Sequence, residues 1–347
     1  MSSSPSIPWL LRWQGLWQGQ RNASRLLPFL PQLAGGLLTA LLLLLPLADR
    51  GGLGLLITAC GLFWLIWGLA TPACGKPLGA VNGWLLAYLA LALLATGFSP
   101  VPAAAAKGLL KLFSYLGVYA LISRLLNEAP RWWDRLLGAL LLGELITAVI
   151  GLRQLYGDTT ELARWADPNS IADGTQRIYS TLENPNLLAG YLLPILPLAL
   201  VALLRWRSPW LRLFALSSLG LGSVAMLLTY SRGGWIGMAI ALSAMGVLLL
   251  LRLSKYLAKP LRRWLPTLLI GGIPGLLAAL GLLFTIVRIG FSQLYRDLFF
   301  SLPCIGAMAA VLGLAGHGLV DTIFFRPEVQ ITGWFLLATL GAGQNHD

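Results

Sequence analysis

Acidic residues, histidine and cysteine are all scarce in this sequence. Its 347 residues include 13 Asp and Glu, two His and three Cys, and charged residues make up only 11% of the chain. Cys60, Cys74 and Cys304 follow no spacing pattern, so they predict neither a disulfide framework nor a metal site. The sequence also has no phosphate-binding loop, no nucleophile-elbow motif and no basic stripe typical of nucleic-acid binding. We therefore expect no metal, no cofactor and no nucleic-acid partner.

Hydrophobic residues, by contrast, make up 57% of the chain, and its mean hydropathy is +0.75. A soluble domain cannot cover so much apolar surface, so lipid must be part of the solvent. Apolar runs at 33–47, 187–204, 213–230 and 236–251 approach the roughly 20 residues that a helix needs to cross a bilayer. The sequence predicts an all-α fold, a polytopic transmembrane helical bundle with membrane lipids as its partners.

The hydrophobic pattern predicts about ten to eleven spans. We place them at 31–47, 51–70, 79–98, 104–123, 136–156, 185–204, 212–230, 233–251, 264–287, 298–320 and 329–343, as one transmembrane domain over 31–343. Residues 1–30 carry Trp9, Trp13 and Trp17 at helical spacing, with arginines between them, and predict an interfacial amphipathic segment.

The Lys and Arg distribution predicts the orientation. With a cytoplasmic N-terminus, fifteen of these residues fall on inner segments and seven at outer ends, which satisfies the positive-inside rule. We therefore expect a multi-pass protein of the inner (plasma) membrane. The long outer loop in this topology is 157–183, which carries much of the chain's polar character.

The C-terminal part of this topology is inconsistent with itself. Arg288 and Arg296 indicate that 288–297 lies inside, and Asp321 and Glu328 indicate that 321–328 lies outside. A single span at 264–287, starting from the basic inner segment before it, would instead deliver residue 288 to the outside. Either a glycine-rich break at 271–275 forms a re-entrant hairpin, or a segment is missing between about 285 and 297.

The first candidate site is the segment that leads into the span at 185. Asn184 can cap the exposed backbone N–H groups of this helix, and Pro185 suits its first position, where a missing N–H costs nothing. A helix N-terminus carries partial positive charge, and Arg177 lies shortly upstream, so Arg177, Asn184 and Asn186 predict an anion site. The alternative interpretation is a well-capped helix beside an interfacial arginine.

The second candidate site is the turn at 230–234 between two spans. Gly233 and Gly237 form a small-residue face that lets helices approach closely, and Ser231 and Arg232 stand at the membrane boundary. A planar guanidinium suits bidentate binding of a phosphate or diphosphate. The alternative is an ordinary snorkelling arginine next to a glycine packing motif.

Three further cations are predicted at the outer surface. Lys107 and Lys111 lie four residues apart on one face of a helix, and Arg153 ends the next span. Outer cations run against the positive-inside tendency, so an anionic ligand shared with Arg177 and Arg232 would explain them. For the two lysines, contact with lipid phosphates is the alternative.

Three ionisable residues within or near spans are candidates for a relay. Glu144 lies in the middle of a span, where a charge is costly, so it predicts a proton or ion relay. Alternatively, it is protonated and hydrogen-bonded to a Thr or Ser of a neighbouring helix. His317 and Asp321 lie one helical turn apart and could act as a general base, although such a pair is commonly a structural cap.

Together these motifs resemble those of the O-antigen ligase and polymerase superfamily of membrane proteins. The closest resemblance is to its cyanobacterial IctB-like branch, whose members are described as bicarbonate transporters. It extends over nearly the whole chain and rests on four segments: Arg177 with Glu183-Asn184-Pro185-Asn186 and Ala189-Gly190; Tyr230-Ser231-Arg232-Gly233-Gly234-Trp235; Gly151-Leu152-Arg153-Gln154-Leu155-Tyr156-Gly157; and Gly316-His317-Gly318-Leu319-Val320-Asp321-Thr322 with Arg326-Pro327-Glu328-Val329.

The resemblance implies two functions. In the enzymes of this superfamily, arginines at the outer face bind the diphosphate of a polyprenyl diphosphate donor. The enzyme then transfers the glycan of this donor to an acceptor. Arg177 and Arg232 would be these diphosphate ligands here. The IctB-like branch instead implies a role in accumulating inorganic carbon as bicarbonate.

The sequence departs from the family pattern between about 285 and 297. A large periplasmic loop and the span after it are absent, and this loop would carry the histidine thought to help the acceptor hydroxyl attack. His317 matches a different family motif. An internal deletion would account for the topological inconsistency, because losing one loop and one helix reverses the side of everything that follows. Three hypotheses remain: a bicarbonate-linked membrane protein, a glycosyltransferase, and a degenerate, non-catalytic membrane protein.

Overall fold

The computed structural model describes residues 27–70, 79–156, 177–253, 288, 298–318 and 327–343. The amphipathic segment at 1–30 lies almost entirely outside the described residues, as do the greater part of the loop at 157–183, the span at 264–287 and Asp321.

The described part of the chain consists of helices, turns and short connections, with no strand in it. The all-α prediction is therefore confirmed for these residues. The α-helices are α2 (Leu30–Leu44), α3 (Arg50–Ala70), α4 (Ala80–Gly97), α5 (Pro102–Glu128), α6 (Trp132–Arg153), α9 (Pro185–Arg205), α10 (Pro209–Leu228), α11 (Arg232–Leu253), α13 (Leu298–Gly318) and α14 (Pro327–Gly343). Short 3-10 helices stand at Leu27–Phe29, Gln154–Tyr156 and Ser180–Leu182 (η4).

Seven of the described helices are long and apolar enough to cross a membrane. They are α2, taken with the turn before it, and α3, α5, α6, α9, α10 and α11. Every predicted span outside 264–287 falls on one of the described helices. A multi-pass membrane protein is thus supported, while the total of ten to eleven crossings stays a prediction.

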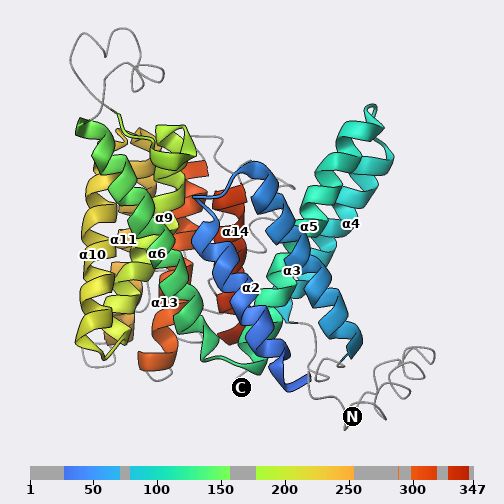
Figure 1. Ribbon diagram of the computed structural model, residues 1–347, viewed down its shortest axis with the longest axis horizontal. Helices are drawn as coiled ribbons and strands as arrows, with labels where there is room; N and C mark the ends of the chain where they lie inside the picture. Colours follow the sequence, from blue (N-terminus) through green and yellow to red (C-terminus); the bar gives the residue numbers. More distant parts are fainter. Residues whose placement is uncertain are drawn as a thin grey trace.

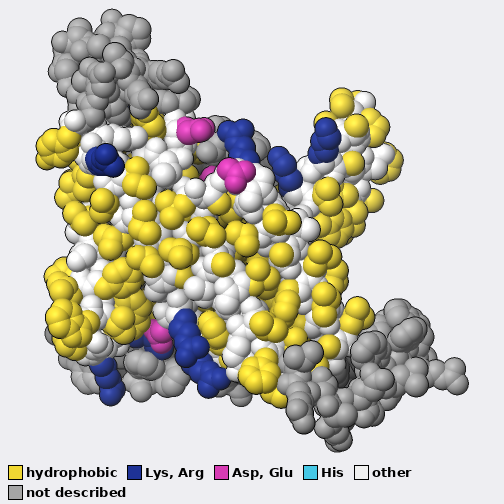
Figure 2. Space-filling view, viewed as in Figure 1, with side chains coloured by type: hydrophobic (Ala, Val, Ile, Leu, Met, Phe, Trp, Pro, Cys, Tyr) yellow, Lys and Arg dark blue, Asp and Glu magenta, His cyan; other side chains and the backbone are white. Residues whose placement is uncertain are grey.

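The surface agrees with a lipid environment. Hydrophobic side chains cover much of the flank in Figure 2, and Lys and Arg gather near its upper and lower ends. Largely exposed apolar residues such as Leu55, Leu69, Leu110 and Trp210 would be unfavourable in water, whereas they match the hydrocarbon core of a bilayer. Helices α4 and α5 lie on the side of the bundle opposite to α10, where α5 packs against α3 and α14 (Figure 1).

Helix α9 forms the centre of the bundle. It begins at Pro185, which suits the first helical position, and most of its residues are buried. It packs against α6, α10, α11, α13 and α14 (Figure 1). Pro194 and Pro197 lie inside this helix, where each removes the N–H that would bond to the carbonyl four residues earlier.

The helices alternate in direction, which gives the bundle two distinct ends. We call the end where α6 finishes and α9 begins the Arg177 end, and the end where α9 finishes the Arg205 end. Gly306 of α13 faces Val201 near the end of α9, whereas Gly313 faces Leu193, closer to its start. Helix α13 therefore runs antiparallel to α9, toward the Arg177 end.

The direction of α13 bears on the topological inconsistency in the sequence. Helix α11 finishes at the Arg205 end, and α13 begins there, since the two helices are antiparallel neighbours. The residues between these two helices, including the predicted span at 264–287, lie outside the described residues, so the number of crossings there stays a prediction.

Close glycine contacts join α9, α11 and α13. A Cβ at Gly237 of α11 would lie 2.5 Å from Leu193 Cδ1 and 2.9 Å from the carbonyl oxygen of Gly313. Only a residue without a side chain permits this approach, as is common where membrane helices pack on small residues. The predicted close-packing role of Gly237 is thus realised at the Arg177 end of the bundle.

Candidate functional site at the Arg177 end

The segment before α9 is fixed to α6 by polar contacts. Gln154 Oε1 accepts the backbone N–H groups of Tyr179, at 3.1 Å, and Ser180, at 2.9 Å. The Ser180 hydroxyl donates to the carbonyl of Thr147 at 2.6 Å. At the start of α9, Asn184 Oδ1 accepts the N–H of Asn186 at 2.8 Å, which confirms the predicted cap.

Arg177 joins the start of α9 to the end of α10. Its Nε donates to the carbonyl of Thr229 at 2.9 Å, and its Nη2 donates to Asn186 Oδ1 at 3.0 Å. The backbone N–H of Ile178 also donates to the carbonyl of Leu228 at 3.2 Å. Arg177 is half-buried, so these contacts position its charge between the two candidate segments that were identified separately in the sequence.

The turn between α10 and α11 has its own capping network. Ser231 is buried, and its hydroxyl accepts the N–H of Gly234 at 3.2 Å, so it caps the start of α11. The N–H of Ser231 donates to the Thr229 hydroxyl at 3.2 Å. Sequence reasoning assigned Ser231 to substrate binding, whereas the structure shows it in addition as the helix cap. Thr229 was missed because a threonine near a helix end gives no distinct signal.

The N-termini of α9 and α11 lie side by side. A Cβ at Gly234, in the first turn of α11, would lie 2.7 Å from the Cβ of Ala189 in α9. Each helix N-terminus carries about half a positive elementary charge, so two of them reinforce one another here. Arg177 and Arg232 add two full charges at the same end.

Backbone strain is concentrated in the turns that lead to these N-termini. Ser180, Glu183 and Tyr230 have φ of 53°, 61° and 49°, and they are the non-glycine residues with positive φ among the described residues. Such conformations are unfavourable for residues with a side chain, and they tend to cluster at functional sites. Here they occur immediately before α9 and immediately before α11.

Arg232 occupies the first position of α11, and its side chain is exposed. It makes no hydrogen bond or ion pair with another described residue. Tyr230 and Trp235 lie beside it, with ring centroids 6.1 Å apart, and both are also exposed. Aromatic side chains of this kind favour the boundary between lipid and water.

No family model, curated protein or solved structure matches this chain. The geometry of the site therefore carries the functional conclusion below.

The structure does not bring the other three predicted cations into this cluster. Arg153 is exposed at the end of α6, close in sequence to Gln154. Lys107 and Lys111 are exposed in the first half of α5, on the side of the bundle opposite to α10 (Figure 1). The structure places all of them toward the Arg177 end but brings only Arg177, Asn184, Asn186, Ser231 and Arg232 into one group.

The predicted relay residues lie inside the bundle. Glu144 is fully buried in α6, and its Oε2 accepts a hydrogen bond from the Ser218 hydroxyl of α10. His317 is fully buried near the end of α13, next to Gly237. Asp321 lies outside the described residues, so the predicted contact of His317 with Asp321 remains a prediction.

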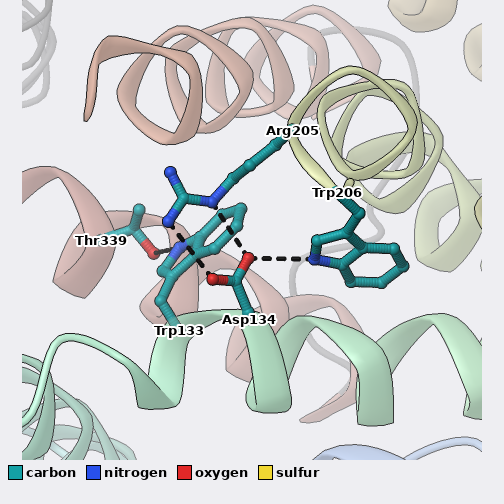
Figure 3. Close-up of polar contacts among 5 residues, drawn as sticks. All are labelled: Trp133, Asp134, Arg205, Trp206 and Thr339. Atoms are coloured by element: carbon teal, nitrogen blue, oxygen red, sulfur yellow. Dashed lines mark hydrogen bonds and ion pairs between the residues drawn. The ribbon is translucent and has the colours of Figure 1, made fainter. Parts of the chain in front are cut away.

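A second polar cluster stands at the Arg205 end, and no feature of the sequence predicted it. Arg205 Nε donates to Asp134 Oδ1 at 3.0 Å, and Trp206 Nε1 donates to the same oxygen at 3.0 Å (Figure 3). The Arg205 guanidinium lies over the Trp133 ring, 5.3 Å from its centroid. Trp133 in turn donates to Thr339 Oγ1 of α14 at 3.3 Å. Each side chain in this cluster has a protein partner, so we assign it to structure.

Proposed function

We propose that this chain is a multi-pass inner-membrane protein that binds an oxyanion at its Arg177 end, on the outer face of the membrane. The proposed orientation rests on the Lys and Arg distribution along the sequence. In it, the N-terminus is cytoplasmic, and Arg177 and Arg232 stand at the outer boundary.

The observation that carries the proposal is the position of Arg232. A cation at the first position of a helix is unfavourable, because the positive end of the helix dipole is already there. Here a second helix N-terminus and Arg177 add further positive charge. Glu183, the acidic residue of the described segment that leads into α9, instead lies 3.8 Å from Arg50, with both groups largely exposed. A bound anion would compensate this concentration of charge.

The arrangement suits a small oxyanion. Guanidinium groups donate two parallel N–H bonds to carboxylate-like and phosphate oxygens, and helix N-termini add backbone donors. Arg177 is held in place by Thr229 and Asn186, so we assign it to positioning the charge, and we assign direct contact with the ligand to Arg232. The resemblance to the IctB-like branch favours bicarbonate as this ligand, in a role in inorganic-carbon accumulation.

A glycosyltransferase is the second candidate, and the aromatic pair beside Arg232 favours it. Tyr230, Trp235 and Ile236 are exposed next to the site, so a lipid-borne diphosphate could reach Arg232 from the bilayer. The ligand would then be the diphosphate of a polyprenyl diphosphate glycan. The sequence lacks the loop that carries the family's catalytic histidine, so this candidate needs a different group to activate the acceptor. A non-catalytic, degenerate membrane protein is the third hypothesis.

The test uses a strain that lacks this gene, complemented with the wild-type chain, Arg232→Ala, or Arg207→Ala as a control at an exposed arginine of the other end. Labelled bicarbonate uptake and profiles of surface and lipid-linked glycans are measured in each strain. An uptake defect that wild type and Arg207→Ala rescue, but Arg232→Ala does not, supports the bicarbonate role. A glycan defect with the same dependence supports the transferase. Full rescue of both by Arg232→Ala would refute the proposed site.

A further inference from the structure

Glu144 lies between α6 and α10, away from both bundle ends. The whole residue is 0% exposed, and one carboxyl oxygen, Oε2, accepts a hydrogen bond from the hydroxyl of Ser218 in α10. The other oxygen, Oε1, is buried and has no hydrogen-bond partner among the described residues. A charged carboxylate in this position would therefore leave one of its two oxygens without a hydrogen bond in an apolar interior.

No cation compensates Glu144 among the described residues. Helix α2 packs on the same part of α6 through the carbonyls of Leu42 and Leu43, next to Gly143, and it contains no titratable side chain. Helix α10 contributes Ser218. The titratable group that faces Glu144 from α9 is Tyr191, which also interacts electrostatically with Glu328 of α14. These groups are acidic or neutral, so none of them supplies positive charge.

The space around Oε1 decides what else could neutralise the carboxylate. Gly222 of α10 lies so close that a Cβ built on it would overlap with Glu144 Oε1, and it would also lie 2.7 Å from Leu196 Cδ2 of α9. The described residues offer no group of three His, Cys, Asp or Glu side chains that could hold a metal ion beside Glu144. A proton needs no additional volume.

We propose that Glu144 is a proton-binding site inside the bundle, and that the bound proton holds α6 and α10 together. With the proton, the carboxyl group is neutral, shares a hydrogen bond with Ser218 and packs against Gly222. Without it, an unpaired carboxylate would stand at a depth where isolated charge is costly, so the α6–α10 contact would have to open or admit water. This site is independent of the oxyanion site, because none of its groups belongs to the Arg177 end.

The first experiment is infrared spectroscopy of the full chain in lipid nanodiscs, with wild type, Glu144→Gln, and Glu183→Gln as a control at an exposed glutamate. At neutral pH we expect wild type and Glu183→Gln to show the carbonyl stretching band of a buried protonated carboxyl group. Glu144→Gln should lack this band. A folded wild-type protein without the band at neutral pH would overturn the proposal.

Two further measurements keep the proposal testable if Glu144→Gln does not fold. In Ser218→Ala the same band should shift in frequency, because the hydrogen bond to the carboxyl group is lost, and an unchanged band would contradict the proposed contact. The unfolding temperature of wild type should fall as pH rises from about 5 to neutral, on the order of 2 °C per pH unit, because over this range the unfolded chain has released the proton that the folded state keeps. A wild-type unfolding temperature that does not fall over this range would count against a proton bound in the folded state.

Discussion

The Arg205 guanidinium holds both carboxylate oxygens of Asp134, with Nε 3.0 Å from Oδ1 and Nη2 3.2 Å from Oδ2. This pair joins α6 to α9 at the end of the bundle opposite to the proposed anion site. Parallel contacts of this kind are stronger and more directional than a single ion pair. The Arg205 side chain is 11% exposed, so solvent screens the interaction only in part. At this end of the bundle, arginine therefore links two helices.

Asp134→Asn should destabilise the protein by about 1–3 kcal/mol, because the substitution removes the charge that Arg205 and Trp206 share. Arg205→Lys should have an effect in the same direction, since lysine cannot reproduce the two parallel bonds. Thermal unfolding in detergent measures the stability of both variants against wild type. Arg207→Lys, at an exposed position two residues away, serves as the control and should leave the unfolding temperature unchanged.

Arg177→Ala and Arg232→Ala should separate structure from binding. Loss of the Arg177 contacts to Thr229 and Asn186 should cost about 1–3 kcal/mol of stability. Arg232 is exposed and has no described partner, so its replacement should change stability by less than about 0.5 kcal/mol. Titration of the purified variants with bicarbonate or inorganic phosphate should show weaker binding in Arg232→Ala. A large loss of stability in this variant would indicate that Arg232 has a structural role instead.

Gly237→Ala should destabilise the contact of α9, α11 and α13 by about 1–3 kcal/mol, because the new methyl group would overlap with Leu193 and the Gly313 carbonyl. Gly246 of the same helix has no atom within 4 Å of an added Cβ. Gly246→Ala should therefore be neutral or stabilising by about 0.5–1 kcal/mol, through the higher helix propensity of alanine. Equal unfolding temperatures for the two variants would contradict the close approach at Gly237.

Cysteine labelling in intact cells should report the proposed orientation. Cys60 and Cys304 are buried, and all three native cysteines are first replaced by serine. In this background, Lys107→Cys at the Arg177 end should react with a membrane-impermeant maleimide added outside. Arg207→Cys at the Arg205 end should react only after the cells are permeabilised. The reverse pattern would place the proposed anion site in the cytoplasm.

The helix positions could be predicted from local features of the sequence. Hydropathy located the spans, and Asn184 with Pro185 located the start of α9 to the residue, because a cap depends on neighbours in the chain. Contacts between distant helices could not be predicted in the same way. Asp134 and Arg205 are far apart in the sequence, and nothing local indicates that they meet. Glu144 illustrates an intermediate case, since its hydrogen bond to a neighbouring Ser or Thr was one of two alternatives but Ser218 could not be singled out.

The sequence predicted the two segments of the candidate site, but not that these segments lie next to each other in the fold. Residues 177–186 and 230–234 were identified as two separate segments, and only the folded chain shows that Arg177 joins them through Thr229. The grouping of Lys107 and Lys111 with these segments rested on a shared membrane surface. A shared surface fixes depth but not lateral position, and the α4–α5 hairpin lies on the other side of the bundle (Figure 1).

The antiparallel pairing of α11 and α13 has a consequence for how such a gene can change. The chain leaves α11 and enters α13 at the same end of the bundle, and the two helices pack directly on one another. A coding insertion or loss between them therefore leaves every flanking helix with its direction and neighbours, provided that the number of crossings it adds or removes is even.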